Sequence, residues 1–266
     1  MKSFSRKTLT EQARFRGRGL HSGEPVKVVV NPGEGGITFN GEQAIPENVT
    51  ETNRCTRLGS VSTIEHLMSA FAGIGVTDAD VVVEGPELPA MDGASLAYAE
   101  GMLAVGLTEL GICRFDRFDS PVIHSDMGVR VTVEAGHGVW RYEFECGERW
   151  PWSQHFQLAL NPESYCNEVA PARTFAFEDE VEAARAAGLG KGLDHNSAFL
   201  IGVSTYVNAP KFKDEPARHK MLDVIGDLYL SGVPIAMLNV VATRSGHTAN
   251  VATADKLRRA VTLQSV

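Results

Sequence analysis

The 266-residue sequence predicts an α+β fold of two tandem domains with similar topology, each a β-sheet packed with helices. Two observations predict it. Each half of the chain runs from strand-like segments into an apolar helical segment with a histidine in its first turns, His66 in one half and His219 in the other. In each half a glycine then ends the helix and another strand-like run follows. We therefore expect domains at residues 1–115 and 116–266, with an active site at their interface.

The elements of the first half follow one another in that order. Strand-like runs separated by glycines fill the first 40 residues, as in "VKVVVNP" and the "GEGGITFNG" that follows it. Residues 61–75, "VSTIEHLMSAFAGIG", switch to helical periodicity, and "DADVVVEG" after them predicts a strand. A second helix is expected at about 95–106, and "ELGICRFDRFDSP" at 109–121 is interpreted as the crossover into the second half.

The second half is predicted to open with two strands, at 128–135 and 139–146. An Ala- and Glu-rich segment at 177–190 predicts a helix that ends at a glycine. A largely buried helix is expected at 215–232, "EPARHKMLDVIGDLYLSG", and the strand-like run "PIAMLNVVATRSG" follows it.

Bulk composition argues against several classes of protein. The net charge of −8 argues against nucleic acid as a partner. The sequence contains no run of 18 apolar residues, so no transmembrane helix is predicted. The N-terminus lacks the apolar core of a secretory signal. The four cysteines lie far apart without a CxxC pair, which favours a reducing cytoplasm over a disulfide framework. We expect a cytoplasmic, monomeric enzyme that acts on a small molecule.

The helix at 215–232 carries a polar stripe on an otherwise apolar surface. His219, Asp223 and Asp227 recur every four residues, so their side chains lie along one line. A solvated helix face would explain a single such pair. The surrounding apolar residues favour instead a line of polar groups that faces a cleft.

Two interpretations apply to Glu65 in the helix at 61–75. Ser62 and Glu65 fit the S-x-x-E capping box, in which the glutamate only binds the start of the helix. Alternatively, His66 is a metal ligand and Glu65 is a general base that takes a proton from metal-bound water. His66, His219 and Asp223 would then form a set of three ligands with a position left for water, as in catalytic zinc sites. The same set also suits ferrous iron.

His247 and Cys55 lie in further segments that bear on the site. His247 in "TRSGHTAN" follows a strand and is expected in a loop, with Asp227 as the carboxylate that fixes its protonation. Cys55 in "NRCTRLG" is the only cysteine near these segments, and we interpret it as a half-buried filler.

The chain resembles the UDP-3-O-(3-hydroxyacyl)-N-acetylglucosamine deacetylases, zinc enzymes that commit sugar to lipid A synthesis in Gram-negative bacteria. Six stretches carry the resemblance, in the same order and spacing over nearly the whole chain. They are "GRGLHSG" (17–23), "VSTIEHLMSAFAGIG" (61–75), "EGPELPAMDGAS" (84–95), "ARTFAF" (172–177), "FKDEPARHKMLDVIGDLYLSG" (212–232) and "RSGH" (244–247). The family fold is two domains of similar topology, in agreement with the repeat described above.

The resemblance implies a role for each matching residue. It implies Zn²⁺ as the cofactor, an acylated UDP-amino sugar as the substrate, and removal of the acetyl group as acetate. The zinc ligands would be His66, His219 and Asp223. The catalytic residues would be Glu65 as the base, His247 with its partner Asp227, and Thr174 as a donor to the tetrahedral intermediate. The substrate-binding residues would be Phe175, Lys220 and His21.

The sequence departs from the family pattern in three places. Ala176 stands where the family has a glycine, and Asn196 lies where an aspartate is expected. The aromatic and His-Pro pattern of the family's uridine pocket is not found at 145–152. Two other interpretations therefore stay open: a zinc deacetylase that acts on another N-acetyl sugar, and a non-catalytic paralogue that binds an acyl sugar.

Overall fold

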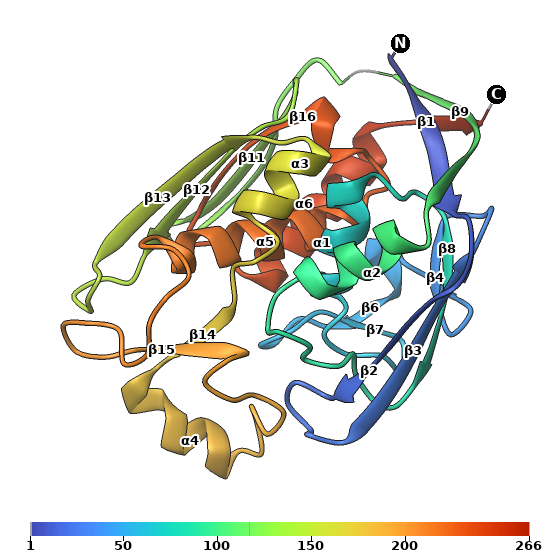
Figure 1. The fold of residues 1–266 in the computed structure, drawn as a ribbon. Helices are drawn as coiled ribbons and strands as arrows, with labels where there is room; N and C mark the ends of the chain where they lie inside the picture. The colour runs from blue at the N-terminus through green and yellow to red at the C-terminus, as the bar shows by residue number, and fades with distance from the viewer. Residues whose placement is uncertain (1, 117, 266) are drawn as a thin grey trace.

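Two five-stranded sheets with the same topology form the outer layers of the molecule, and most of the helices lie between them (Figure 1). The computed structural model describes residues 2–116 and 118–265. The first sheet, in the order β2-β3-β8-β4-β5, contains Ala13–Arg18, Pro25–Pro32, Ala79–Glu84, Ile37–Phe39 and Glu42–Gln43. The second, in the order β10-β11-β16-β12-β13, contains Val122–Asp126, Val129–Ala135, Leu238–Thr243, Val139–Glu145 and Ser153–Ala159.

The pairing directions agree strand for strand between the two sheets. In each sheet the last strand in sequence lies in the middle. It pairs antiparallel with the second strand, β3 or β11, and parallel with the third, β4 or β12. The expectation of two α+β units with similar topology is therefore confirmed.

Six helices are described, and all but α4 occupy the space between the sheets. They are α1 (Glu65–Ile74), α2 (Leu96–Ala104), α3 (Pro162–Glu168), α4 (Val181–Ala186), α5 (Glu215–Tyr229) and α6 (His247–Ala260). Helix α1 packs directly against α5, and α5 and α6 cover the second sheet. One continuous apolar core runs from Leu9 in the first half to Leu257 in the second. The core is therefore continuous across the junction of the two halves.

Smaller elements complete the fold. A three-stranded sheet, β1-β9-β17, joins Lys2–Leu9, Leu107–Phe115 and Leu263–Ser265, so it brings the two ends of the chain together. The parallel strands β14 (Thr174–Phe177) and β15 (Ala198–Ile201) and helix α4 project beside the second sheet (Figure 1). The short pair β6 (Val49–Glu51) and β7 (Arg57–Leu58) precedes α1. Three 3₁₀ turns lie at Pro46–Asn48, Glu178–Glu180 and Ile235–Met237.

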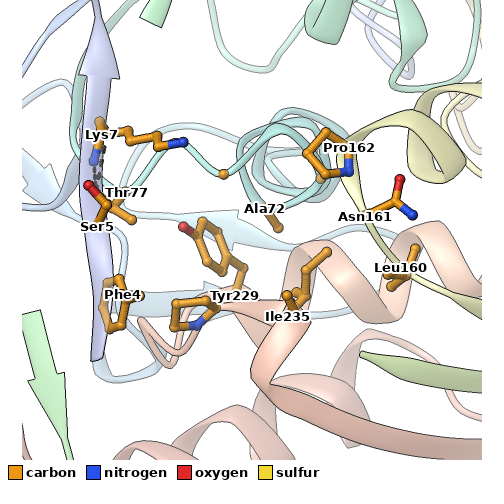
Figure 2. A pocket seen from close by; sticks show the side chains of 14 residues that line it. Phe4, Ser5, Lys7, Ala72, Thr77, Leu160, Asn161, Pro162, Tyr229 and Ile235 are labelled. Atoms are coloured by element: carbon orange, nitrogen blue, oxygen red, sulfur yellow. Dashed lines mark hydrogen bonds between the residues drawn. The ribbon is translucent and has the colours of Figure 1, made fainter. Parts of the chain in front are cut away.

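Strand β1 lies near the C-terminal ends of α1 and α5. A cavity of about 200 Å³ lies there, lined by residues of β1, α1 and the end of α5 (Figure 2). The Tyr229 hydroxyl donates to the carbonyl of Val76 at 2.7 Å, and the Lys7 backbone N–H donates to Thr77 Oγ1 at 2.8 Å. These bonds tie the second-half helix and the N-terminal strand to the loop after α1.

The structure differs from the local expectations in several places. The helix expected at 61–75 begins only at Glu65, because Val61 and Ser62 pair as bridges with Leu58 and Glu87. In the segment 109–121, interpreted as the crossover, the residues up to Phe115 belong to strand β9. The helix expected at 177–190 is a 3₁₀ turn followed by the short α4. Helix α6 was not expected at all.

Candidate metal centre and active site

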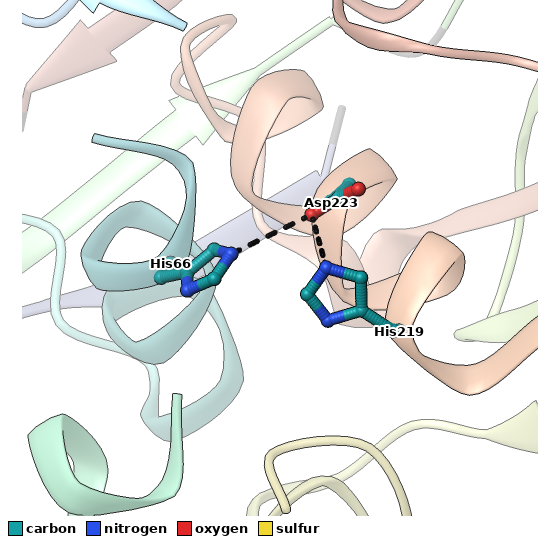
Figure 3. Close-up of side chains that lie close together, drawn as sticks. All are labelled: His66, His219 and Asp223. Atoms are coloured by element: carbon teal, nitrogen blue, oxygen red, sulfur yellow. Dashed lines mark ion pairs between the residues drawn. The ribbon is translucent and has the colours of Figure 1, made fainter. Parts of the chain in front are cut away.

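Two histidines and an aspartate from α1 and α5 point toward one another where the two halves meet (Figure 3). His66 Nε2 lies 3.8 Å from Asp223 Oδ1, and His219 Nε2 lies 3.5 Å from the same oxygen. One candidate ligand atom from each residue lies within 4.8 Å of the other two. The helical spacing of His219 and Asp223 aims both at His66 across the interface. The structure thus brings together the three residues predicted as metal ligands.

The hydrogen bonds of this group leave the atoms that a metal ion needs. His219 Nδ1 lies 3.1 Å from the carbonyl oxygen of Ala172, so Nδ1–H donates there and Nε2 keeps its lone pair. Asp223 Oδ2 accepts from Lys220 Nζ at 3.0 Å, whereas the buried Oδ1 has no partner among the described residues. A buried carboxylate oxygen without a partner is costly unless a cation binds it. Two imidazoles and one carboxylate fit a catalytic zinc ion.

Electrostatics favour the metal-binding protonation state of each ligand. Burial lowers the pKa of His66 to about 3, and burial also lowers the pKa of His219. Both imidazoles are therefore neutral at pH 7, the form that coordinates metals. Burial alone would raise the pKa of Asp223, but its neighbours His219 and Lys220 outweigh burial and hold that pKa below its ordinary value.

Glu65 faces the same point and does not cap its helix. Helix α1 begins at Glu65 without a side-chain cap, so the capping-box alternative with Ser62 is wrong. Glu65 Oε2 instead accepts the backbone N–H of Thr56 at 2.9 Å. Burial raises the pKa of Glu65 to about 8; His247 opposes that rise, while Asp227 and Asp223 add to it. A carboxyl with this pKa is suited to moving a proton near neutral pH.

His247 is the first residue of α6 rather than part of a loop. Its Nδ1 lies 3.0 Å from Asp227 Oδ2, the pairing that the sequence predicted. Burial favours the neutral imidazole, but Asp227 and Glu65 outweigh it and raise the pKa of His247 to about 9. Whereas the imidazoles of His66 and His219 are neutral, that of His247 is a cation at pH 7.

A cavity of about 280 Å³ opens onto these groups. Besides Glu65, His247 and the three ligand candidates, it is lined by Thr174, Phe175, Lys220 and His21. Asp227 lies behind His247, outside this lining. The Phe175 ring lies 6.0 Å from that of His219, and Lys220 Nζ lies 5.9 Å from the Phe175 centroid. The residues predicted from separate motifs therefore share one cavity.

A buried ion pair holds the strand that carries Thr174. The backbone N–H and Nε of Arg173 both donate to Glu215 Oε1 at 2.9 Å, which fixes the start of β14 to the start of α5. The backbone N–H of Thr174 donates to the carbonyl of Gly93 at 2.7 Å. Contacts from both halves thus set the position of Thr174 at the cavity wall.

Some residues of the site were not predicted. Thr56 and Asn250 are buried and donate to Asp227, and Arg54 lines the cavity beside His21. The spacing of Asn250 three residues after His247 on α6 would have placed both on one face, had the helix been recognised. Cys55 is buried, burial raises its pKa to about 11, and the ligand group does not include it. It fits the predicted role of a filler.

The arrangement can carry out hydrolysis assisted by a metal ion. It combines three candidate ligands, a buried carboxyl with a raised pKa and an imidazolium held by a carboxylate, all around one cavity. The addition of water to a substrate requires a proton acceptor, and the departure of a poor leaving group requires a proton donor. The carboxyl and the imidazolium can fill these two roles on one substrate.

Comparison with known proteins identifies relatives of this chain. The family model described as UDP-3-O-acyl N-acetylglycosamine deacetylase matches residues 6–259. A UDP-3-O-acyl-N-acetylglucosamine deacetylase of Geotalea uraniireducens is 36% identical over 262 residues, which are 91% of this chain and 85% of the relative. A protein of the same name from a Nostoc species is 31% identical over 276 residues, 94% of this chain and 97% of the relative. Among the described residues, no helix is both long and apolar enough to span a membrane.

Proposed function

The chain belongs to the UDP-3-O-acyl N-acetylglycosamine deacetylase family, and from this premise we propose that it hydrolyses the acetamide of UDP-3-O-(3-hydroxyacyl)-N-acetylglucosamine with zinc. The products are acetate and the free 2-amino sugar. This reaction is the committed step of lipid A synthesis. One observation carries the proposal: Asp223 Oδ1, which has no hydrogen-bond partner among the described residues, lies 3.8 and 3.5 Å from two imidazole Nε2 atoms, in a cavity that Glu65 also lines.

His66, His219 and Asp223 would hold the zinc ion. When bound, zinc supplies a Lewis acid for the acetamide carbonyl, lowers the pKa of water toward about 7 and favours the ionised form of the Glu65 carboxyl. The hydrogen bond from His219 Nδ1 to the Ala172 carbonyl keeps that ring in the tautomer that binds through Nε2.

Glu65 is the proposed general base. Its carboxylate takes one proton from the attacking water, and the hydroxyl oxygen bonds to the acetamide carbon. Because the side chain is buried and its Oε2 is held by the Thr56 N–H, the carboxylate stays oriented during the reaction. Thr174 and Lys220, which line the same cavity, are suited to stabilise the negative charge that develops on the carbonyl oxygen.

His247 is the proposed general acid. The amine departs poorly as an anion, so a proton must reach the sugar nitrogen as the carbon–nitrogen bond breaks. The His247 imidazolium supplies this proton, because Asp227 and Glu65 keep its pKa at about 9. The proton that Glu65 took from water then restores the His247 imidazolium, and the acetic acid that leaves with the free amine ionises to acetate in water.

Substrate contacts are proposed for His21, Phe175 and Lys220, all in the lining of the cavity. The Lys220 ammonium offers a positive charge to the sugar nucleotide, and the Phe175 ring offers an apolar face to the sugar. Ala184 and Leu189 line the same cavity from the segment around α4, and they suit an acyl chain.

We also propose a domain boundary, an oligomeric state and a cellular location. We propose a domain boundary between residues 115 and 116, since strand β9 ends at Phe115. We propose a monomer, which light scattering after gel filtration tests. We propose a cytoplasmic protein, in keeping with four cysteines that are all free thiols.

The test is acetate release from the acylated UDP-N-acetylglucosamine by purified protein of known metal content. We expect release that stops on chelation and returns with zinc. Release only from other N-acetyl sugars would favour the deacetylase of altered substrate. Full zinc loading without hydrolysis of any acetamide would favour a non-catalytic acyl-sugar binder and overturn the proposal.

A further inference from the structure

Thr56 is hydrogen-bonded to two acidic residues, Glu65 in the cavity lining and Asp227 behind it. Its backbone N–H donates to Glu65 Oε2 at 2.9 Å, and its Oγ1 donates to Asp227 Oδ1 at 2.6 Å. A carboxylate only accepts, so the threonine hydroxyl must be the donor in the second bond. Glu65 belongs to the first half of the chain and Asp227 to the second, so a single residue spans the two carboxylates.

Asp227 is held by three donors. Its Oδ2 accepts from His247 Nδ1 at 3.0 Å and from Asn250 Nδ2 at 2.9 Å, while Oδ1 accepts from Thr56. Three donors from two different halves leave this carboxylate one orientation. The direction of the His247 ring then follows from the direction of Asp227.

Thr56 is itself rigidly placed. It is fully buried, and its carbonyl accepts from the backbone N–H of Ile64 at 3.1 Å, immediately before α1. All three of its hydrogen-bonding groups are therefore used, and every bond leads to α1 or to Asp227. A residue that only filled space would not need a hydroxyl at this position.

We propose that Thr56 is a positioning residue that fixes the general base Glu65 relative to the Asp227–His247 pair. The proposal rests on the proposed deacetylase function. Base and acid must act on the same substrate amide, one on the carbon side and one on the nitrogen, so their separation matters for turnover. The Thr56 hydroxyl sets the Asp227 end of this separation, and the Thr56 N–H sets the Glu65 end.

Substitution of the hydroxyl alone tests the proposal. Thr56→Val keeps the shape and the backbone N–H but removes the donor to Asp227, and Thr56→Ser keeps the donor. We expect Thr56→Val to lower kcat about 10- to 100-fold with unchanged KM and metal content, and Thr56→Ser to stay within about threefold of wild type. Thr253→Val is the matched control, because the Thr253 hydroxyl is equally buried but bonds only to the Ala249 carbonyl of its own helix.

A spectroscopic measurement separates positioning from loss of stability. With one donor fewer, Asp227 accepts more strongly from His247, so the His247 Nδ1–H proton resonance should move downfield in Thr56→Val. It should stay in place in Thr56→Ser and Thr253→Val. In a His247→Ala background, Thr56→Val should cost far less than it does alone, because both changes remove the same function.

Each outcome decides one question. Wild-type kcat in Thr56→Val, equal losses in the Val and Ser variants, or full additivity with His247→Ala would overturn the role of Thr56 while leaving the proposed function intact. A metal-loaded wild-type protein without acetate release would overturn the proposed function and this inference with it.

Discussion

Glu65 is a residue whose role in catalysis can be separated from metal binding. Its carboxylate has no part in the ligand group, so Glu65→Gln should keep the wild-type metal content. Gln has nearly the same shape but cannot take a proton, so kcat should fall about 10²- to 10⁴-fold. Metal analysis and acetate release on the same preparation measure both quantities. Turnover within tenfold of wild type would show that another group removes the water proton.

The charge of His247 predicts the alkaline limb of the pH profile. Below its pKa of about 9 the imidazole holds the proton that the leaving amine needs, and above that pH it does not. We therefore expect kcat/KM to fall as the pH rises through about 9.

The Asp227→Asn variant tests whether His247 causes this fall in kcat/KM at alkaline pH. Burial lowers the pKa of His247, and without the Asp227 charge the largest opposing interaction is lost. The limb should move down by one unit or more, toward the ordinary histidine value of about 6.5. A limb that stays near 9 in this variant would assign it to a different group. Lys220, whose pKa the neighbouring Asp223 raises to about 12 against the effect of burial, titrates too high to be confused with it.

Among individual residues, the sequence predicts site membership for those that follow a spacing rule. His219, Asp223 and Asp227 were recognisable because four-residue intervals on one helix put them on one line. Thr56 was not, because its partners are 9 and 171 residues away and no local pattern marks a threonine that bonds to both. The roles carried by His21, Phe175 and Thr174 came from resemblance, since single residues in loops and short strands have no periodicity.

Helices α1 and α5 approach each other closely at Gly226, one helical turn from the candidate metal ligand Asp223. A Cβ at Gly226 would lie only 2.0 Å from the carbonyl oxygen of Glu65. Because that atom belongs to the backbone, the helices themselves would have to separate. We expect Gly226→Ala to cost about 2–3 kcal/mol of stability, as overpacked cores do, and to weaken zinc binding by moving His66 away from α5. Thermal unfolding and zinc titration measure the two effects.

Gly35→Ala provides the control for that change. A Cβ at Gly35 meets no atom within 4 Å, so this variant should unfold and bind zinc as the wild type does. Equal behaviour of the two variants would mean that the close approach of α1 and α5 has no consequence for the site.

Element boundaries were harder to predict than element types. Periodicity predicted a helix from residue 61, but bridges at Val61 and Ser62 keep that segment extended until Glu65. This difference bears on the role of Glu65. Because Glu65 is the first helical residue, it does not occupy the third position of the helix that a capping box with Ser62 requires. Helix α6 was missed although Asn250, Val251, Ala254 and Leu257 are buried at helical spacing. Its many polar residues and its position after a strand made a loop the simpler expectation.

The repeat of the whole molecule was predictable because each half repeats the same order of elements. The order of the elements along the chain does not predict how the strands pair within each sheet. In both sheets the last strand lies between the second and the third. Helices α1 and α5 pack against each other, so the candidate ligands meet where the two halves adjoin and not within either half.

A metal ion at this position should stabilise the whole chain, because it joins His66 of the first half to His219 and Asp223 of the second. Binding to the folded state alone adds about 2.7 kcal/mol at a zinc concentration 100 times the Kd. For a protein of this size that corresponds to a rise in Tm of about 5–10 °C. Chelation should reverse the rise, as followed by calorimetry. Asp223→Ala should abolish the zinc-dependent shift, whereas Glu65→Gln should keep it. A wild-type Tm that is insensitive to zinc and to chelator would exclude a metal bridge between the halves.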